Sequence, residues 1–172
     1  KMQAWIREGG KLIAMESAAG QLAGKKGFSL KNKEEDKKDE KNKNPYENIK
    51  SFQNRERDVL NSSIPGAIYK VNLDNSHPLA FGFPDFYYTL KLDDHLYEYL
   101  EDGWNVGVLK KNNYVTGFAG QKTRKKLVDG LLFGVQEMGQ GSVVYLIDDP
   151  LFRSFWENGK LLFCNAVFMV GN

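Results

Sequence analysis

The stretch Gly9 to Gln21, written GGKLIAMESAAGQ, predicts a strand, a tight turn and a helix in direct succession. Residues 12–15 are apolar without polar alternation, which is typical of a strand buried on both faces of a parallel sheet covered by helices. The small residues of 17–23 are compatible with a helix. This unit therefore favours an α/β fold.

Further helix and strand signals surround this unit. We predict one domain over residues 1–172, in which residues 31–43, with six lysines and five acids, form a charged loop or insertion. Helices are predicted at residues 2–8, 46–60 and 161–170, with a short helical turn at 151–156. Strands are predicted at residues 67–73, 86–90 and 104–109, and a hairpin joins 131–136 to 142–147 through a glycine-containing turn.

Composition limits the class of protein. The 172 residues are 41% hydrophobic and 27% charged, as expected of a globular domain with its own core. A net charge of +2 argues against a nucleic-acid partner. No apolar run approaches the ~20 residues of a membrane span. The chain opens on Lys1, inside a predicted helix, so we expect a fragment of a longer protein.

The turn after residue 15 has the geometry of a nucleophile elbow, which raises one side chain above a sheet beside helix amides. Ser17 is a candidate nucleophile, but a serine needs a base to accept its proton. The chain has two histidines, His77 and His95, and the sequence places neither beside Ser17. Alternatively, Ser17 caps the helix. Glu16 either has a raised pKa through burial or faces solvent.

Other chemical signals have simpler interpretations. Cys164 lies in an apolar segment and is interpreted as inert core. His95 and Glu98 have the spacing of two zinc ligands, but the sequence offers no later histidine, so the match is interpreted as coincidence. The basic run 122–126 is interpreted as a solvated face.

The elbow also resembles that of class I glutamine amidotransferases, whose pattern is glycine, any residue, cysteine, any residue, glycine, any residue, glutamine. Aligned on Gln21, this pattern puts Ser17 at the cysteine, Ala19 at the second glycine and Met15 at the first. The catalytic cysteine is therefore replaced, which argues against amidotransferase chemistry.

Several further segments occur in a characteristic order: residues 9–14, 64–68, 77–82, 139–144, 149–156 and 161–166. The chain is similar to the C-terminal amidotransferase-like domain of certain secreted bacterial zinc carboxypeptidases. The resemblance implies a flavodoxin-like three-layer sandwich with a mostly parallel sheet and a C-terminal hairpin, whose first strands would precede Lys1.

The function implied by the resemblance is that of a non-catalytic accessory domain for positioning, ligand binding or assembly. No cofactor is expected in this chain, and zinc is expected only in an upstream peptidase domain, which is the expected partner. Secretion or a periplasmic location is implied, and a homo-oligomer is left open. No residue is assigned a catalytic role; the candidates are Ser17, Glu16 and His77. The alternatives are a divergent hydrolase or amidase that uses Ser17, and an interaction module that uses the aromatic stretch 81–99.

Overall fold

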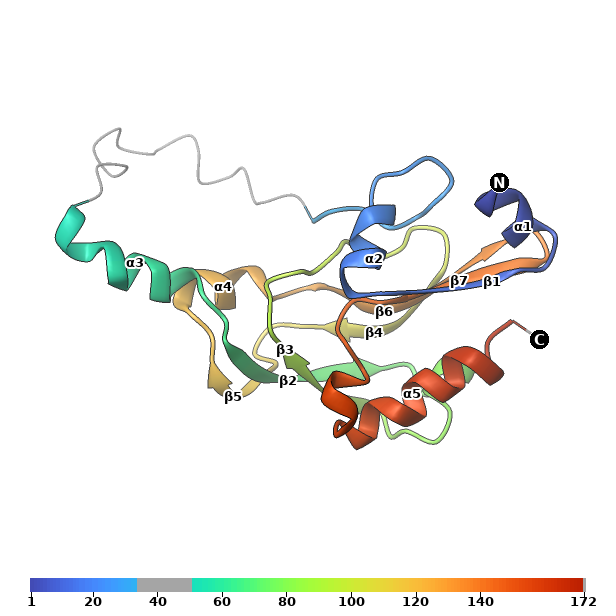
Figure 1. The fold of residues 1–172 in the computed structure, drawn as a ribbon. Helices are drawn as coiled ribbons and strands as arrows, with labels where there is room; N and C mark the ends of the chain where they lie inside the picture. Colours follow the sequence, from blue (N-terminus) through green and yellow to red (C-terminus); the bar gives the residue numbers. More distant parts are fainter. Residues whose placement is uncertain (34–50, 172) are drawn as a thin grey trace.

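The fold is seen in a computed structural model that describes residues 1–33 and 51–171 (Figure 1). The described strands form one seven-stranded sheet in the order β1-β7-β6-β4-β2-β3, and β5 pairs with β2 away from this path. The strands are β1 (Lys11–Met15), β2 (Gly66–Leu73), β3 (Phe86–Lys91), β4 (Trp104–Leu109), β5 (Tyr114–Phe118), β6 (Gly130–Met138) and β7 (Gly141–Leu146).

Helices flank this sheet on two sides. α2 and α5 lie on opposite faces of the part formed by β1, β7 and β6, whereas α3 and α4 lie with β5 at the far end (Figure 1). No residue of α3 is buried, so that helix protrudes from the core. The helices are α1 (Met2–Arg7), α2 (Glu16–Leu22), α3 (Arg55–Ser62), α4 (Gln121–Lys126) and α5 (Glu157–Phe168).

The prediction of a mostly parallel, flavodoxin-like sheet is wrong. Among the described strands, β1 and β7 form the parallel pair, and all other pairings are antiparallel. The physical reason is the connections, because parallel neighbours need a crossover of a dozen or more residues, usually a helix. Between β2 and β7 the described helical segments are only α4, of six residues, and one short 3₁₀ turn.

Several local predictions are nevertheless confirmed. β6 and β7 form the predicted antiparallel hairpin, joined at Gly139 with φ 67°. β1 and α2 form the predicted strand and helix, but β1 is an edge strand in which only Ala14 is buried, so the expected burial on both faces is wrong. α5 starts four residues before the expected helix at 161. β5 and α4 were not predicted. Residues 34–50, which include most of the charged run and the start of the expected 46–60 helix, lie outside the described residues.

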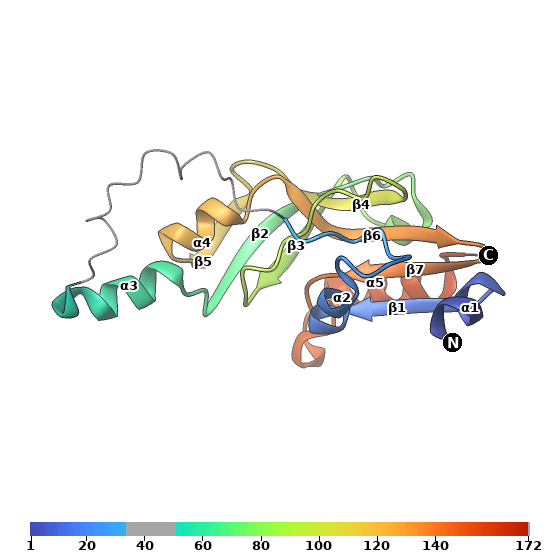
Figure 2. The same cartoon turned by 90° about the horizontal axis from the view of Figure 1, so that it is seen from above.

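The sheet is bent, and this bend brings distant strands together. The register shifts within the β4–β6 and β2–β5 pairings, and such irregularities increase bending and twist. Figure 2 shows β2 and β3 running at an angle to β1, β6 and β7. The ring of Tyr87 in β3 meets that of Phe133 in β6 edge to face at 5.4 Å. β3, the last strand in the sheet order, therefore packs against β6, which lies near the middle of that order.

Candidate site at the carboxyl ends of β1 and β7

The tight turn after β1 is strained at Glu16. Met15 is extended, with φ −116° and ψ 147°, and Glu16 starts α2 with φ 46°. A non-glycine residue in the left-handed region costs on the order of 1 kcal/mol and often marks a functional turn. The predicted strand, turn and helix are thus confirmed, but the residue at the elbow is Glu16, one position before Ser17.

Carboxylates gather around this elbow. Met15 is in register with Leu146 of the parallel strand β7, so the two strands end side by side. Asp148 and Asp149 follow the end of β7 after Ile147. Partial burial raises the pKa of Glu16, and the negative charges of Asp149, Asp93 and Asp148 raise this pKa further. At this edge of the sheet, the exposed carboxyl group of Glu16, a residue with a strained backbone, therefore lies near three aspartates.

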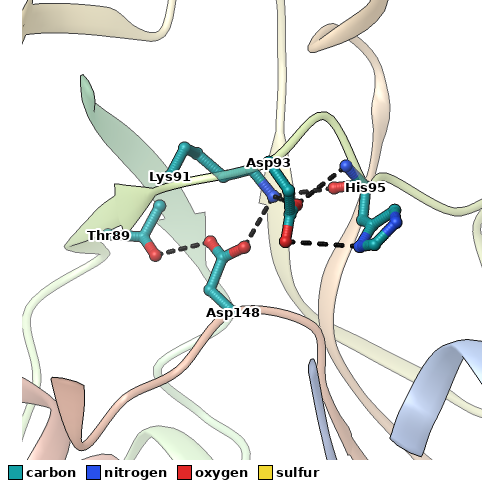
Figure 3. A network of polar contacts seen from close by, with 5 residues as sticks. All are labelled: Thr89, Lys91, Asp93, His95 and Asp148. Carbon is teal, nitrogen blue, oxygen red and sulfur yellow. Dashed lines mark hydrogen bonds and ion pairs between the residues drawn. The ribbon is translucent and has the colours of Figure 1, made fainter. Parts of the chain in front are cut away.

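A polar network centred on the buried Lys91 joins the end of β3 to the segment after β7 (Figure 3). The Nζ of Lys91, a fully buried side chain, donates to Asp148 Oδ1 at 2.6 Å, to the His95 carbonyl at 2.7 Å and to Asp93 Oδ1 at 3.3 Å. The hydroxyl of Thr89 donates to Asp148 Oδ2 at 2.6 Å. The three protons of the ammonium group and both oxygens of Asp148 therefore have partners.

Strand alternation explains how a lysine reaches this position. Every second side chain of β3 is buried, namely those of Tyr87, Thr89 and Lys91. Burial lowers the pKa of Lys91, but the Asp148 and Asp93 carboxylates outweigh that effect and raise it, so the ammonium stays charged. Burial raises the pKa of Asp148. The alternation of β3 was the sequence signal that could have identified Lys91 as buried, but it does not identify Asp148 as the partner.

The predicted site residues do not come together as one site. Ser17 is exposed within the first turn of α2, and no side-chain hydrogen bond caps that helix, so the capping interpretation is wrong. His77 lines a pocket with Ser142, which is in register with Lys11 at the opposite end of β1. Within residues 1–33 and 51–171, no hydrogen bond joins Ser17 to His77 or His95.

Two further predictions concern reactive or metal-binding side chains. Cys164 is exposed, so its interpretation as core is wrong, because the buried face of α5 is formed by other residues of that helix. His95 Nδ1 lies 3.3 Å from Asp93 Oδ2. Among the described residues, no three His, Cys, Asp or Glu side chains are arranged to hold a metal ion.

Comparison with known proteins adds no relative. No family model, no curated protein and no solved structure matches this chain. In residues 1–33 and 51–171, no helix has the length and apolar character needed to cross a membrane.

Proposed function

We propose that this chain is a binding domain without turnover of its own, which serves a zinc carboxypeptidase-like protein as an accessory domain. The observation that supports this proposal is the elbow itself. The position that carries the nucleophile in elbow enzymes is held by Glu16, whose pKa is raised by partial burial and then by the neighbouring carboxylates. The association with a peptidase rests on the sequence resemblance.

The surrounding groups support binding more than chemistry. An elbow nucleophile acts with a base in hydrogen-bond reach, and His77 lies at the far end of β1. The Lys91 ammonium donates to Asp148, Asp93 and a backbone carbonyl, so it is committed within the protein. Zinc chemistry is assigned to a separate domain, and no ligand role is given to His95.

The exposed rim of this edge indicates the chemistry of a partner. Glu16 is exposed, and Asp149 and Asp93 are partly exposed beside it. These acids favour a basic surface or ligand through complementary charge. The buried Lys91–Asp148 pair supports the rim from behind, since it ties β3 to the end of β7.

The proposal is tested with the full-length protein and with the isolated peptidase domain. Ser17→Ala should leave kcat/KM for peptide hydrolysis within about twofold, whereas Glu16→Lys should weaken the association of this chain with the peptidase domain by tenfold or more, measured by calorimetry. Glu8→Lys is the matched control, because Glu8 is an exposed carboxylate near the opposite end of β1.

Two results would overturn the proposal. One is loss of turnover in Ser17→Ala with an unchanged melting temperature, which would make the chain catalytic. The other is a coding sequence upstream of Lys1 without a zinc carboxypeptidase domain. The alternative module based on residues 81–99 has less support, because Tyr87 and Tyr97 of that stretch are buried, although Phe81 is 61% exposed.

A further inference from the structure

A pocket of about 420 Å³ lies at the amino-terminal end of β7, away from the Glu16 edge. We call it the Trp104 pocket; its polar and aromatic lining consists of Asp74, Ser76, His77, Trp104, Glu137 and Ser142. The remaining lining includes Pro78, Val135 and Val170. The pocket therefore combines an aromatic ring, two carboxylates and an apolar wall.

The indole of Trp104 is exposed and hydrogen-bonded to a neighbouring carboxylate. The side chain is 53% exposed, which is high for a tryptophan at the start of a central strand. Its Nε1 donates to Glu137 Oε1 at 3.3 Å, and the imidazole of His77 lies 6.1 Å away between ring centres. An aromatic ring held in this way offers a pre-oriented surface to a ligand, which lowers the entropic cost of binding.

The charged side chains of the pocket lining are two carboxylates, whereas Lys11, in register with Ser142, lies next to the lining and donates from its Nζ to the Val167 carbonyl at 2.8 Å. Glu137 and Asp74 supply two carboxylates, and none of the described residues that line the pocket is lysine or arginine. Burial lowers the pKa of His77, so this imidazole is neutral near pH 7. The Leu79 backbone N–H donates to its Nδ1 at 3.0 Å, which leaves the proton on Nε2. The carboxylates are therefore not neutralised from within the lining.

A buried hydroxyl adds a second sign of a binding site. Ser142 is 3% exposed and lines the same pocket, and its Oγ has no hydrogen-bond partner among the described residues. Buried polar atoms are nearly always satisfied, so such an atom calls for an explanation. Gly171 packs against this hydroxyl, so a polar group of a ligand would become its partner by displacing Gly171.

We propose that the Trp104 pocket binds an organic cation on an apolar stem, of the kind carried by lysine or arginine side chains of a basic peptide. The cation would lie against the Trp104 ring, where cation–π attraction is strongest for tryptophan, and close to the Glu137 and Asp74 carboxylates. The stem would pack on Val135 and Val170. This site is independent of the proposed accessory role and lies at the other end of β1 and β7.

The test is a titration followed by NMR on the ¹⁵N-labelled chain. The probe is Nα-acetyl-lysine methylamide, and the readout is the indole N–H signal of Trp104, assigned with Trp104→Phe. A saturable shift is expected. The neutral analogue Nα-acetyl-norleucine methylamide should bind at least tenfold more weakly, because it keeps the stem and lacks the charge.

Variants locate the site. Trp104→Ala should weaken lysine-probe binding by roughly five- to thirtyfold. Trp5→Ala is the matched control, since Trp5 is 52% exposed on α1 and lies outside this lining. Glu137→Gln, at an exposed position, should weaken binding by at least about threefold and remains informative if Trp104→Ala does not fold.

Four results would each overturn the proposal. The first is equal affinity for the lysine and norleucine probes, and the second is no saturable shift of the Trp104 signal at 50 mM probe (roughly −1.8 kcal/mol of binding energy). The third is an equal loss of affinity for the lysine probe in Trp5→Ala and Trp104→Ala. The fourth is tighter binding of a neutral monosaccharide than of the lysine probe. The last result would assign the tryptophan to sugar stacking instead.

Discussion

Polar clusters lie at the two ends of the β1–β7 pair, and they differ in how completely their polar groups are hydrogen-bonded within the protein. At the carboxyl ends, Lys91, Asp148 and Thr89 satisfy one another in a site closed to solvent. At the other end, Trp104 and Glu137 are exposed and Ser142 is buried without a partner. The first cluster therefore joins strands of the sheet, whereas the second contains the site that we propose for an organic cation.

The largest expected effect comes from breaking the buried ion pair. Lys91→Met leaves the Asp148 carboxylate buried without its cation, so the free energy of unfolding should fall by about 3–5 kcal/mol. Urea denaturation followed by circular dichroism measures the loss. The double variant Lys91→Met/Asp148→Leu should recover at least half of it, because no lone charge is then buried. A loss below about 1 kcal/mol in the single variant would show that the network does not join the strands.

High pH should lower the stability that the buried Lys91 cluster contributes to the unsubstituted protein. The pKa of Lys91 is raised, so the stability it contributes is present below its unfolded pKa of about 10.4 and is lost as pH rises through the folded value. Burial also raises the pKa of Tyr87 and Tyr145, and the sign is the same. The free energy of unfolding should therefore be nearly flat from pH 7 to 9 and fall above about pH 10, by up to ~1.4 kcal/mol per pH unit for each group. A rise in stability above pH 10 in urea titrations would contradict this.

Two buried hydroxyls allow a direct comparison of the two ends. Thr89 is 2% exposed and donates to Asp148, whereas Ser142 is 3% exposed and has no partner among the described residues. Thr89→Val should cost about 1–3 kcal/mol, since it removes a hydrogen bond to a buried carboxylate. Ser142→Ala should cost less than about 0.5 kcal/mol or stabilise the protein. Equal losses in thermal unfolding would remove the distinction between the two clusters.

Substitutions at the elbow should change the free energy of unfolding least, and two glycine substitutions there should change it in opposite directions. Glu16→Gly should stabilise the protein by up to about 1 kcal/mol, because glycine adopts a φ of 46° without strain. Ala18→Gly, at an exposed position of the same helix, should instead destabilise it by about 1 kcal/mol. Melting temperatures measured by calorimetry check both. Destabilisation by both substitutions would show that no strain is stored at Glu16.

Local sequence patterns predicted much of the secondary structure and part of the site. The apolar run before Glu16 and the glycines around Gln140 identified β1 and the β6–β7 hairpin, since burial and turn chemistry act on neighbouring residues. The elbow was predicted as a turn, but the alignment on Gln21 favoured Ser17, and only the backbone angle identified Glu16 as the residue in the left-handed region.

What the sequence determined by itself is therefore the set of local elements, together with the replacement of cysteine at the elbow. The tertiary structure decided how those elements pair. Lys91 and Asp148 are 57 residues apart, and no pattern around either residue specifies the other. The bend of an antiparallel sheet brings them into contact and places His77 beside Trp104 instead of Ser17. Pairing between distant segments depends on packing and connection geometry, which local periodicity does not encode.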